Sequence, residues 1–113
     1  MCCCIALAQP ANDNCPGVTL SVNPTCINTS GDIAGGTFAG YMASCGGVPN
    51  HDVFYNFVAT AVNNVVTVTP CATMDAVIQV YSGSCGGTSI GCYNTGTAGV
   101  AEVAHLSALI VGN

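Results

Sequence analysis

The sequence predicts an all-β fold, a single antiparallel β-sandwich that is stapled by disulfide bonds. Short runs of Val, Thr and Ile are separated by Gly, Asn and Pro, and no segment has the roughly 3.6-residue apolar period of an amphipathic helix. Six cysteines are dispersed through the body of the chain. The length of 113 residues suffices for one domain and is too short for two.

Four segments have the strongest strand patterns. In the second of them, alternation with period two places Tyr55 and Phe57 on one face, and we expect both rings in the core. In the fourth, the same alternation predicts that Ala76, Ile78 and Val80 face inward. The four segments are residues 18–22, 53–59, 65–69 and 76–81.

Further strands are predicted by shorter runs with weaker patterns. Pairs of glycines mark the loops between several of them, and Asn63-Asn64 is a turn signal before the third strong strand. Strands at such short intervals are typical of an antiparallel sandwich. The weaker segments are residues 26–30, 37–39, 89–92, 100–104 and 108–111.

The first eight residues form an apolar leader that differs from the body. They contain the block Cys2-Cys3-Cys4 and end in Ala6-Leu7-Ala8, which matches the small-x-small pattern that signal peptidase cleaves. We therefore expect residues 1–8 to be the remnant of a signal peptide and residues 9–113 to be the mature domain. The alternative is that residues 1–8 are retained as an apolar N-terminal strand.

The cysteines of the body form an even set, which in a short chain with a secretory leader predicts a disulfide framework. Such a framework implies an extracellular or cell-surface location. The body contains no Cys-x-x-Cys spacing and the two histidines match no paired ligand pattern, so a zinc site is not expected. The six cysteines are Cys15, Cys26, Cys45, Cys71, Cys85 and Cys92.

The charge pattern excludes several classes of partner. The chain contains no Lys or Arg and five Asp or Glu residues, for a formal net charge of −5. Nucleic acid is excluded because phosphate neutralisation requires cations, and anionic membrane surfaces are disfavoured for the same reason. No apolar run reaches the length of about 20 residues that a membrane span needs.

Several segments in order resemble a known family. These are residues 10–15 (Pro-Ala-Asn-Asp-Asn-Cys), the Ser-Cys-Gly-Gly loop at 44–47, the strand at 52–59, residues 74–87 and the closing Cys92. Together they resemble the disulfide-bonded β-sandwich modules of secreted bacterial proteins, related to pre-peptidase C-terminal and CUB-like domains. The resemblance implies a jelly-roll or CUB-like sandwich without catalytic activity, which accompanies proteases and adhesins and is often proposed to bind carbohydrate or to act as a spacer.

The resemblance also implies a disulfide pairing. It suggests Cys15 with Cys26 and Cys85 with Cys92, which leaves Cys45 for Cys71. Modules of this type usually continue with one or two strands beyond the segment that corresponds to residues 106–111. A sandwich that lacks a closing strand has an open sheet edge, and such an edge favours self-association. A gene fragment is the alternative explanation.

Residues that could support catalysis do not form a recognisable set. His51 and Asp52 are neighbours on a predicted strand, so their side chains point to opposite faces. His105 is isolated, and residues 83–86 lack the Gly-x-Ser-x-Gly pattern of a nucleophile elbow. We therefore expect that the protein is not an enzyme.

Calcium is the one cofactor that the sequence leaves open. Asp13, Asp52 and Asp75 open or precede strands, where their carboxylates could converge at one end of a sandwich. The chain has no EF-hand-type run of ligands, and a calcium site needs about six to eight oxygens, so we expect no cofactor and keep Ca²⁺ as an alternative. Asn28-Thr29-Ser30 is a glycosylation sequon, which fits an exposed loop.

Two functions remain. The first is a secreted structural subunit that self-assembles into an extracellular filament or surface layer, and the nearly uncharged composition favours it. The second is an accessory or adhesion module that binds a glycan or a cell-surface protein through the loop residues Tyr41, Tyr93 and Asn94. The absence of Trp and the low aromatic content favour the first function.

Overall fold

The structure is a computed structural model, which describes residues 10–22, 25–47 and 50–113. Its described part is all-β and contains no helix, as the sequence predicts, and therefore no helix long and apolar enough to cross a membrane. The leader predicted at residues 1–8 lies outside the described residues. The strands are β1 (Val18–Thr19), β2 (Tyr55–Asn56), β3 (Asn64–Val68), β4 (Ile78–Ser82), β5 (Thr88–Tyr93) and β6 (Glu102–Leu106).

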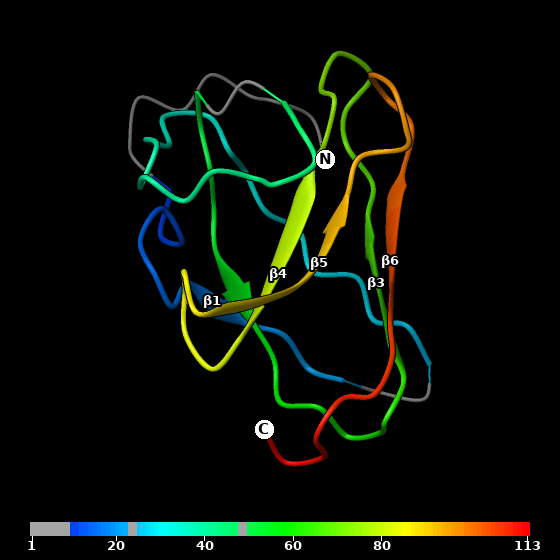
Figure 1. The fold of residues 1–113 in the computed structure, drawn as a ribbon. Helices are drawn as coiled ribbons and strands as arrows, with labels where there is room; N and C mark the ends of the chain where they lie inside the picture. Colours follow the sequence, from blue (N-terminus) through cyan, green and yellow to red (C-terminus); the bar gives the residue numbers. More distant parts are fainter. Residues whose placement is uncertain (1–9, 23–24, 48–49) are drawn as a thin grey trace.

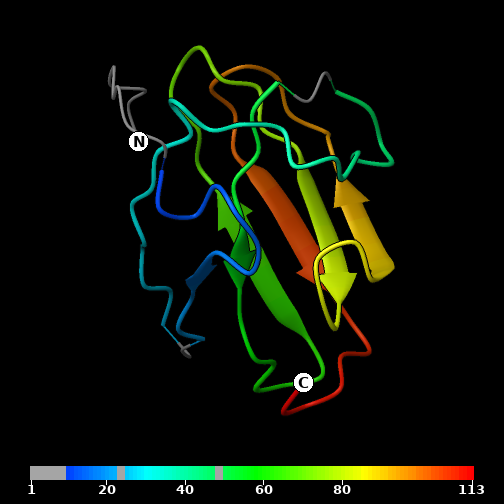
Figure 2. The same ribbon diagram turned by 90° about the vertical axis from the view of Figure 1, so that its left-hand side faces the viewer.

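The strands form three two-stranded sheets. β3 pairs with β6 and β4 pairs with β5, both antiparallel, whereas the short strands β1 and β2 pair in parallel. The β4–β5 register is irregular between Val80 and Tyr81. Figures 1 and 2 show the β3–β6 and β4–β5 pairs next to each other, with β1 and β2 beside them and the C-terminus at the lower end.

β6 has the clearest amphipathic alternation in the molecule. Glu102, Ala104 and Leu106 are buried, whereas Val103 and His105 are exposed. Successive side chains of a strand point to opposite faces, so this alternation places one face of β6 against the interior. The burial of Glu102 on that inner face is unusual, because an ionisable side chain stands where an apolar one is expected.

The predicted strands are confirmed in part. All four strong segments and the weaker ones at 89–92 and 100–104 contain strands, although β1 and β2 have only two residues each. Residues 26–30, 37–39 and 108–111 form no strand, and that part of the prediction is wrong. Tyr55 is exposed rather than buried, because only the short β1 pairs with the strand that carries it.

The C-terminal residues pair with the segment that precedes β3. The N–H of Leu109 donates to the carbonyl of Val62 at 2.9 Å, and Gly112 donates to Ala59 at 2.8 Å. Ala59 in turn donates to the carbonyl of Asn113 at 3.0 Å. These bonds continue the antiparallel contact of β3 and β6 toward the C-terminus, although the backbone there is not regular enough to be a strand.

The apolar core is small. In the ranges that the structure describes, the buried apolar side chains are Ala59, Ala76, Ala104 and Leu106. Ile78 and Val80, predicted to face inward, are half-buried like their neighbours on β4. The large apolar side chains that remain exposed are Val18, Ile27, Phe38, Tyr41, Met42, Tyr55, Val58, Val62, Val65, Ile90, Val100, Val103, Ile110 and Val111.

Candidate functional site

Two disulfide bonds join segments that are distant in the sequence. Cys15 pairs with Cys85 across 70 residues, and Cys45 pairs with Cys92 across 47 residues. The predicted pairs Cys15–Cys26, Cys85–Cys92 and Cys45–Cys71 are therefore wrong. Cys26 is exposed and forms no disulfide bond with any described residue. Cys71 is half-buried, and its Sγ lies 3.8 Å from Thr73 Oγ1.

Hydrogen bonds explain why Cys15 lies beside Cys85 and not beside Cys26. The segment around Cys15 lies along β2, because Phe54 N–H donates to Asn12 at 2.8 Å and Val18 N–H donates to Phe54 at 3.1 Å. This contact carries Cys15 to the turn after β4. A pairing within one short loop would have required the chain to turn back after β1.

Gln79 of β4 performs a similar role for the second disulfide bond. Its Oε1 accepts hydrogen bonds from the N–H and the hydroxyl of Ser44, at 2.9 and 3.0 Å. Its Nε2 donates to Ser89 Oγ at 2.7 Å and to the carbonyl of Gly91 at 2.9 Å. Because Gln79 is in register with Cys92, these bonds bring Cys45 onto its partner.

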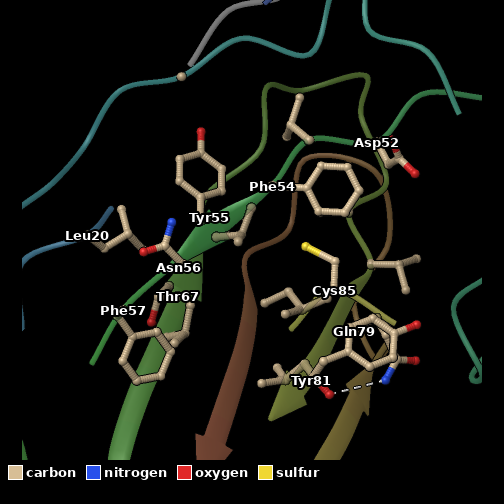
Figure 3. Close-up of a pocket in the computed structure, with 18 of the residues that line it drawn as sticks. Leu20, Asp52, Phe54, Tyr55, Asn56, Phe57, Thr67, Gln79, Tyr81 and Cys85 are labelled. Atoms are coloured by element: carbon tan, nitrogen blue, oxygen red, sulfur yellow. Dashed lines mark hydrogen bonds between the residues drawn. The ribbon is translucent and has the colours of Figure 1, made fainter. Parts of the chain in front are cut away.

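A cavity of about 1730 Å³ lies between the sheets and the loops that surround them. Its walls include side chains from β2, β3 and β4 and from the loops before β1 and after β4. Figure 3 shows Leu20, Tyr55, Asn56 and Phe57 gathered on one side of the cavity, with Phe54, Gln79, Tyr81 and Cys85 on the other. The buried core is small because side chains around this cavity do not pack closely against one another.

Three aromatic rings cluster on one wall of the cavity. The rings of Tyr41 and Phe54 are 5.9 Å apart between centroids with planes at 85°, and those of Tyr41 and Tyr81 are 6.3 Å apart at 62°. Edge-to-face arrangements of this kind stabilise aromatic pairs. Tyr41 also covers Gly86, where a Cβ atom would overlap the ring. We call Tyr41, Phe54 and Tyr81 the aromatic cluster.

The sequence predicted Tyr41, Tyr93 and Asn94 as one set of binding residues, but the structure separates them. Tyr41 is 40% exposed and lines the cavity. The hydroxyl of Tyr93 donates to the carbonyl of His105 at 3.1 Å, and Asn94 Nδ2 donates to the carbonyl of Cys45 at 3.3 Å. Tyr93 and Asn94 therefore tie β5 and the loop after it to neighbouring backbone.

The carboxylates of Asp13 and Asp52 both bind the loop at residues 36–39. Asp13 is buried and accepts hydrogen bonds from the N–H and the hydroxyl of Thr37. Asp52 accepts from the N–H of Ala39 at 3.1 Å, and its own N–H donates to the carbonyl of Thr37 at 3.2 Å. The two predicted calcium ligands are thus brought to one loop, where backbone and hydroxyl donors occupy their oxygens.

Asp75, the third candidate calcium ligand, is exposed in the loop before β4. Within the described ranges, no three His, Cys, Asp or Glu side chains are grouped so that they could hold a metal ion. The sequon at Asn28, Thr29 and Ser30 lies in an exposed segment, as the sequence predicts.

The two histidines are not positioned as a catalytic pair. His51 Nδ1 lies 2.7 Å from the carbonyl oxygen of Gly36, and His105 is exposed on the outer face of β6. The carboxylate of Asp52 binds Ala39 rather than a histidine. Each of these polar groups holds a loop or faces solvent.

Glu102 is a structural residue that the sequence pattern did not reveal. Its carboxylate is wholly buried and accepts hydrogen bonds from the N–H groups of Thr95, at 2.7 Å, and of Gly96. It thereby closes the loop that joins β5 to β6. A single Glu at an inward position of an amphipathic strand was the available signal, because burial of a carboxylate requires such partners.

Comparison with profiles of known protein families, with curated proteins and with solved structures found no match for this chain.

Proposed function

We propose that this protein is a secreted, non-catalytic structural β-sandwich that self-associates outside the cell. The observation that carries the proposal is the contrast between the small set of buried apolar side chains and the large set of exposed ones. Large exposed apolar patches on a folded domain mark surfaces that bind another molecule. A second copy of the chain would bury this surface and complete the core.

The sandwich itself is part of the proposal. The β3–β6 and β4–β5 pairs would be its two layers, and the hydrogen bond from Tyr93 of β5 to His105 of β6 supports their proximity. The buried face of β6 fits an interior between layers. The resemblance to secreted jelly-roll or CUB-like modules supports the same architecture.

The face of the β3–β6 sheet that carries exposed side chains is the best candidate for the contact between copies, although Val65 and Thr67 on this face also line the cavity. Val65 is in register with His105, and Thr67 is in register with Val103, and all four side chains are exposed. No acidic side chain lies among them, so two such faces would meet without the repulsion that a net charge of −5 otherwise causes. β3 is also an open edge, since β6 is its only strand partner among the described residues.

Two further observations support an extracellular location. Disulfide bonds persist in oxidising compartments, and this structure has two of them between distant segments. The absence of Lys and Arg argues against a nucleic-acid partner inside a cell.

The association can be tested by sedimentation velocity and negative-stain electron microscopy of the secreted protein. A double variant, Val65→Asp with Val103→Asp, adds two like charges to the proposed contact and should sediment as a monomer. Val100→Asp is the matched control, because Val100 is exposed but lies outside this face, and it should leave the assembly intact. Monodisperse monomers of the wild-type protein at all concentrations would refute the proposal.

A second test asks whether residues 1–8 contribute to assembly. Protein that starts at Gln9 should form the same assemblies as the longer chain if the β3–β6 face makes the contact. Fibres that are lost only in the shorter protein would assign the contact to strand donation by the N-terminal segment instead.

Binding of a glycan or a cell-surface protein is the second candidate function. The partly exposed Tyr41 at the cavity wall favours it, because carbohydrate sites commonly present an exposed aromatic ring. Binding of the monomeric double variant on a glycan array, abolished by Tyr41→Ala, would support this function independently of assembly.

A further inference from the structure

The aromatic cluster holds three rings at large mutual angles at one wall of the cavity. The plane of Tyr41 is nearly perpendicular to that of Phe54 and steeply inclined to that of Tyr81. All three side chains line the cavity, and Tyr41 remains partly exposed. The face of an aromatic ring carries partial negative charge, so rings that converge at large angles attract a cation placed between them.

The charges around the cavity have the same sign. Asp52 and Asp75 line it together with the aromatic cluster, whereas the whole sequence contains no Lys or Arg. No Lys or Arg side chain can therefore occupy the ring faces or neutralise these carboxylates. A ligand with positive charge is complementary to both features.

We propose that the aromatic cluster binds the quaternary ammonium group of a small organic cation, such as choline. A quaternary ammonium group has no N–H to donate, so it does not depend on free hydrogen-bond acceptors. This matters here because the carboxylate of Asp52 already accepts the N–H of Ala39. The group instead gains dispersion and electrostatic attraction from ring faces, with the carboxylates contributing at longer range.

Two features hold the rings in place before a ligand arrives. Tyr41 packs over Gly86, where only a residue without a Cβ atom leaves room for the ring. Cys85, next to Gly86, is joined by its disulfide bond to Cys15. A preorganised cluster loses little conformational entropy on binding, which favours affinity. None of the three rings of the aromatic cluster lies on β3 or β6, so this site can be tested separately from the proposed self-association, although Val65 and Thr67 line the same cavity.

The test compares two ligands of nearly equal shape on the wild-type protein. Choline and its neutral isostere 3,3-dimethylbutan-1-ol are titrated separately, and binding is followed by NMR chemical shifts of the aromatic ring protons. We expect choline to bind with a dissociation constant of about 1 mM and the neutral isostere to bind at least about fivefold more weakly, as the cation–π contribution requires. Equal affinities would overturn the proposal, as would the absence of shifts with either ligand.

Two single variants test whether choline binds at the aromatic cluster. Tyr41→Leu should weaken choline binding about fivefold, because one ring face is removed from the cluster. Tyr55→Leu is the matched control, since Tyr55 is equally exposed and lines the cavity on the side away from Phe54 and Tyr81 (Figure 3). Unchanged choline affinity in Tyr41→Leu, with the disulfide bonds intact, would refute the assignment.

A quaternary ammonium group also occurs on lipid headgroups, and a third arm separates the two sources. Wild-type protein is mixed with phosphatidylcholine vesicles with and without excess free choline. Cosedimentation that free choline reverses would assign the site to the headgroup, whereas choline binding in solution without cosedimentation would assign it to a free small molecule.

Discussion

The carboxylate of Glu102 accepts the N–H of Thr95 at 2.7 Å in the interior of a chain that has no Lys or Arg to neutralise it. Asp13 and Thr37 have the same relationship, in which a buried carboxylate accepts a backbone N–H and a hydroxyl. Each pair fixes a loop that contains a glycine. In this protein, hydrogen bonds from N–H and hydroxyl groups stabilise the buried carboxylates, in place of the ion pairs with Lys or Arg that buried carboxylates commonly form.

Removal of the Glu102 carboxylate should destabilise the fold. Glu102→Ala leaves the N–H groups of Thr95 and Gly96 without their acceptor, so we expect the free energy of unfolding to fall by about 2–4 kcal/mol. Glu102→Gln keeps one oxygen, which can accept both N–H groups as Oε1 does here, and should cost about half as much, although it loses the charge and the second acceptor oxygen. Urea denaturation measures both. Asp75→Asn, at an exposed acid, is the control and should change stability by less than about 0.5 kcal/mol.

Two glycines with positive φ should respond differently to alanine. Gly17 has φ of 74°, and a Cβ atom there would overlap the carbonyl oxygen of Phe54. Gly40 has φ of 97° and open space around it. Gly40→Ala should cost about 1 kcal/mol from backbone strain alone, whereas Gly17→Ala adds a clash and should cost more than about 3 kcal/mol. Equal losses in thermal denaturation would contradict the close packing of residues 17 and 54.

Peptide mapping should recover Cys15 with Cys85 and Cys45 with Cys92. Trypsin has no site in this chain, so pepsin digestion under non-reducing conditions followed by mass spectrometry is the measurement. A peptide that joins Cys85 to Cys92 would contradict the structure.

The long loops give these disulfide bonds a large expected contribution. Replacing Cys15 and Cys85 together by Ser should reduce the free energy of unfolding by about 4 kcal/mol, given the 70-residue separation. Cys26→Ser is the control, because Cys26 is exposed and forms no disulfide bond with a described residue. Its stability should match that of the wild type.

Calcium should not stabilise the protein. The oxygens of Asp13 and Asp52 accept hydrogen bonds from Thr37 and Ala39, and a bound cation would have to displace these donors. A site with a dissociation constant of about 0.1 mM would add about 2.7 kcal/mol at 10 mM Ca²⁺, which a thermal melt detects readily. We expect no shift in Tm between 10 mM Ca²⁺ and EDTA, and a clear rise would restore calcium as a ligand.

The positions of the main strands could be predicted from local pattern. Residues 65–69, 76–81 and 100–104 alternate or cluster β-branched residues, and each overlaps a strand of the structure. The local pattern gave wrong predictions where pairing with a distant segment decides whether a strand forms or a side chain is buried. Residues 26–30 have β-branched residues but no partner strand, and Tyr55 is exposed because β2 pairs over only two residues.

The candidate site was predicted less well, for a physical reason. Tyr41 was identified from its loop, but its contacts with Phe54 and Tyr81 depend on segments that are far apart in the sequence. The predicted disulfide pairs were wrong for the same reason. Short loops between cysteines suggested local pairs, whereas hydrogen bonds along β2 and at Gln79 bring distant cysteines together.

By itself, the sequence determined the all-β class, the absence of cationic side chains and the presence of disulfide bonds, because these follow from composition and from patterns within a few residues. Only the tertiary structure decided which cysteines pair, which carboxylates are buried and which aromatic rings share a wall. Those properties depend on contacts between residues that are tens of positions apart, and no local pattern specifies which of the possible contacts form.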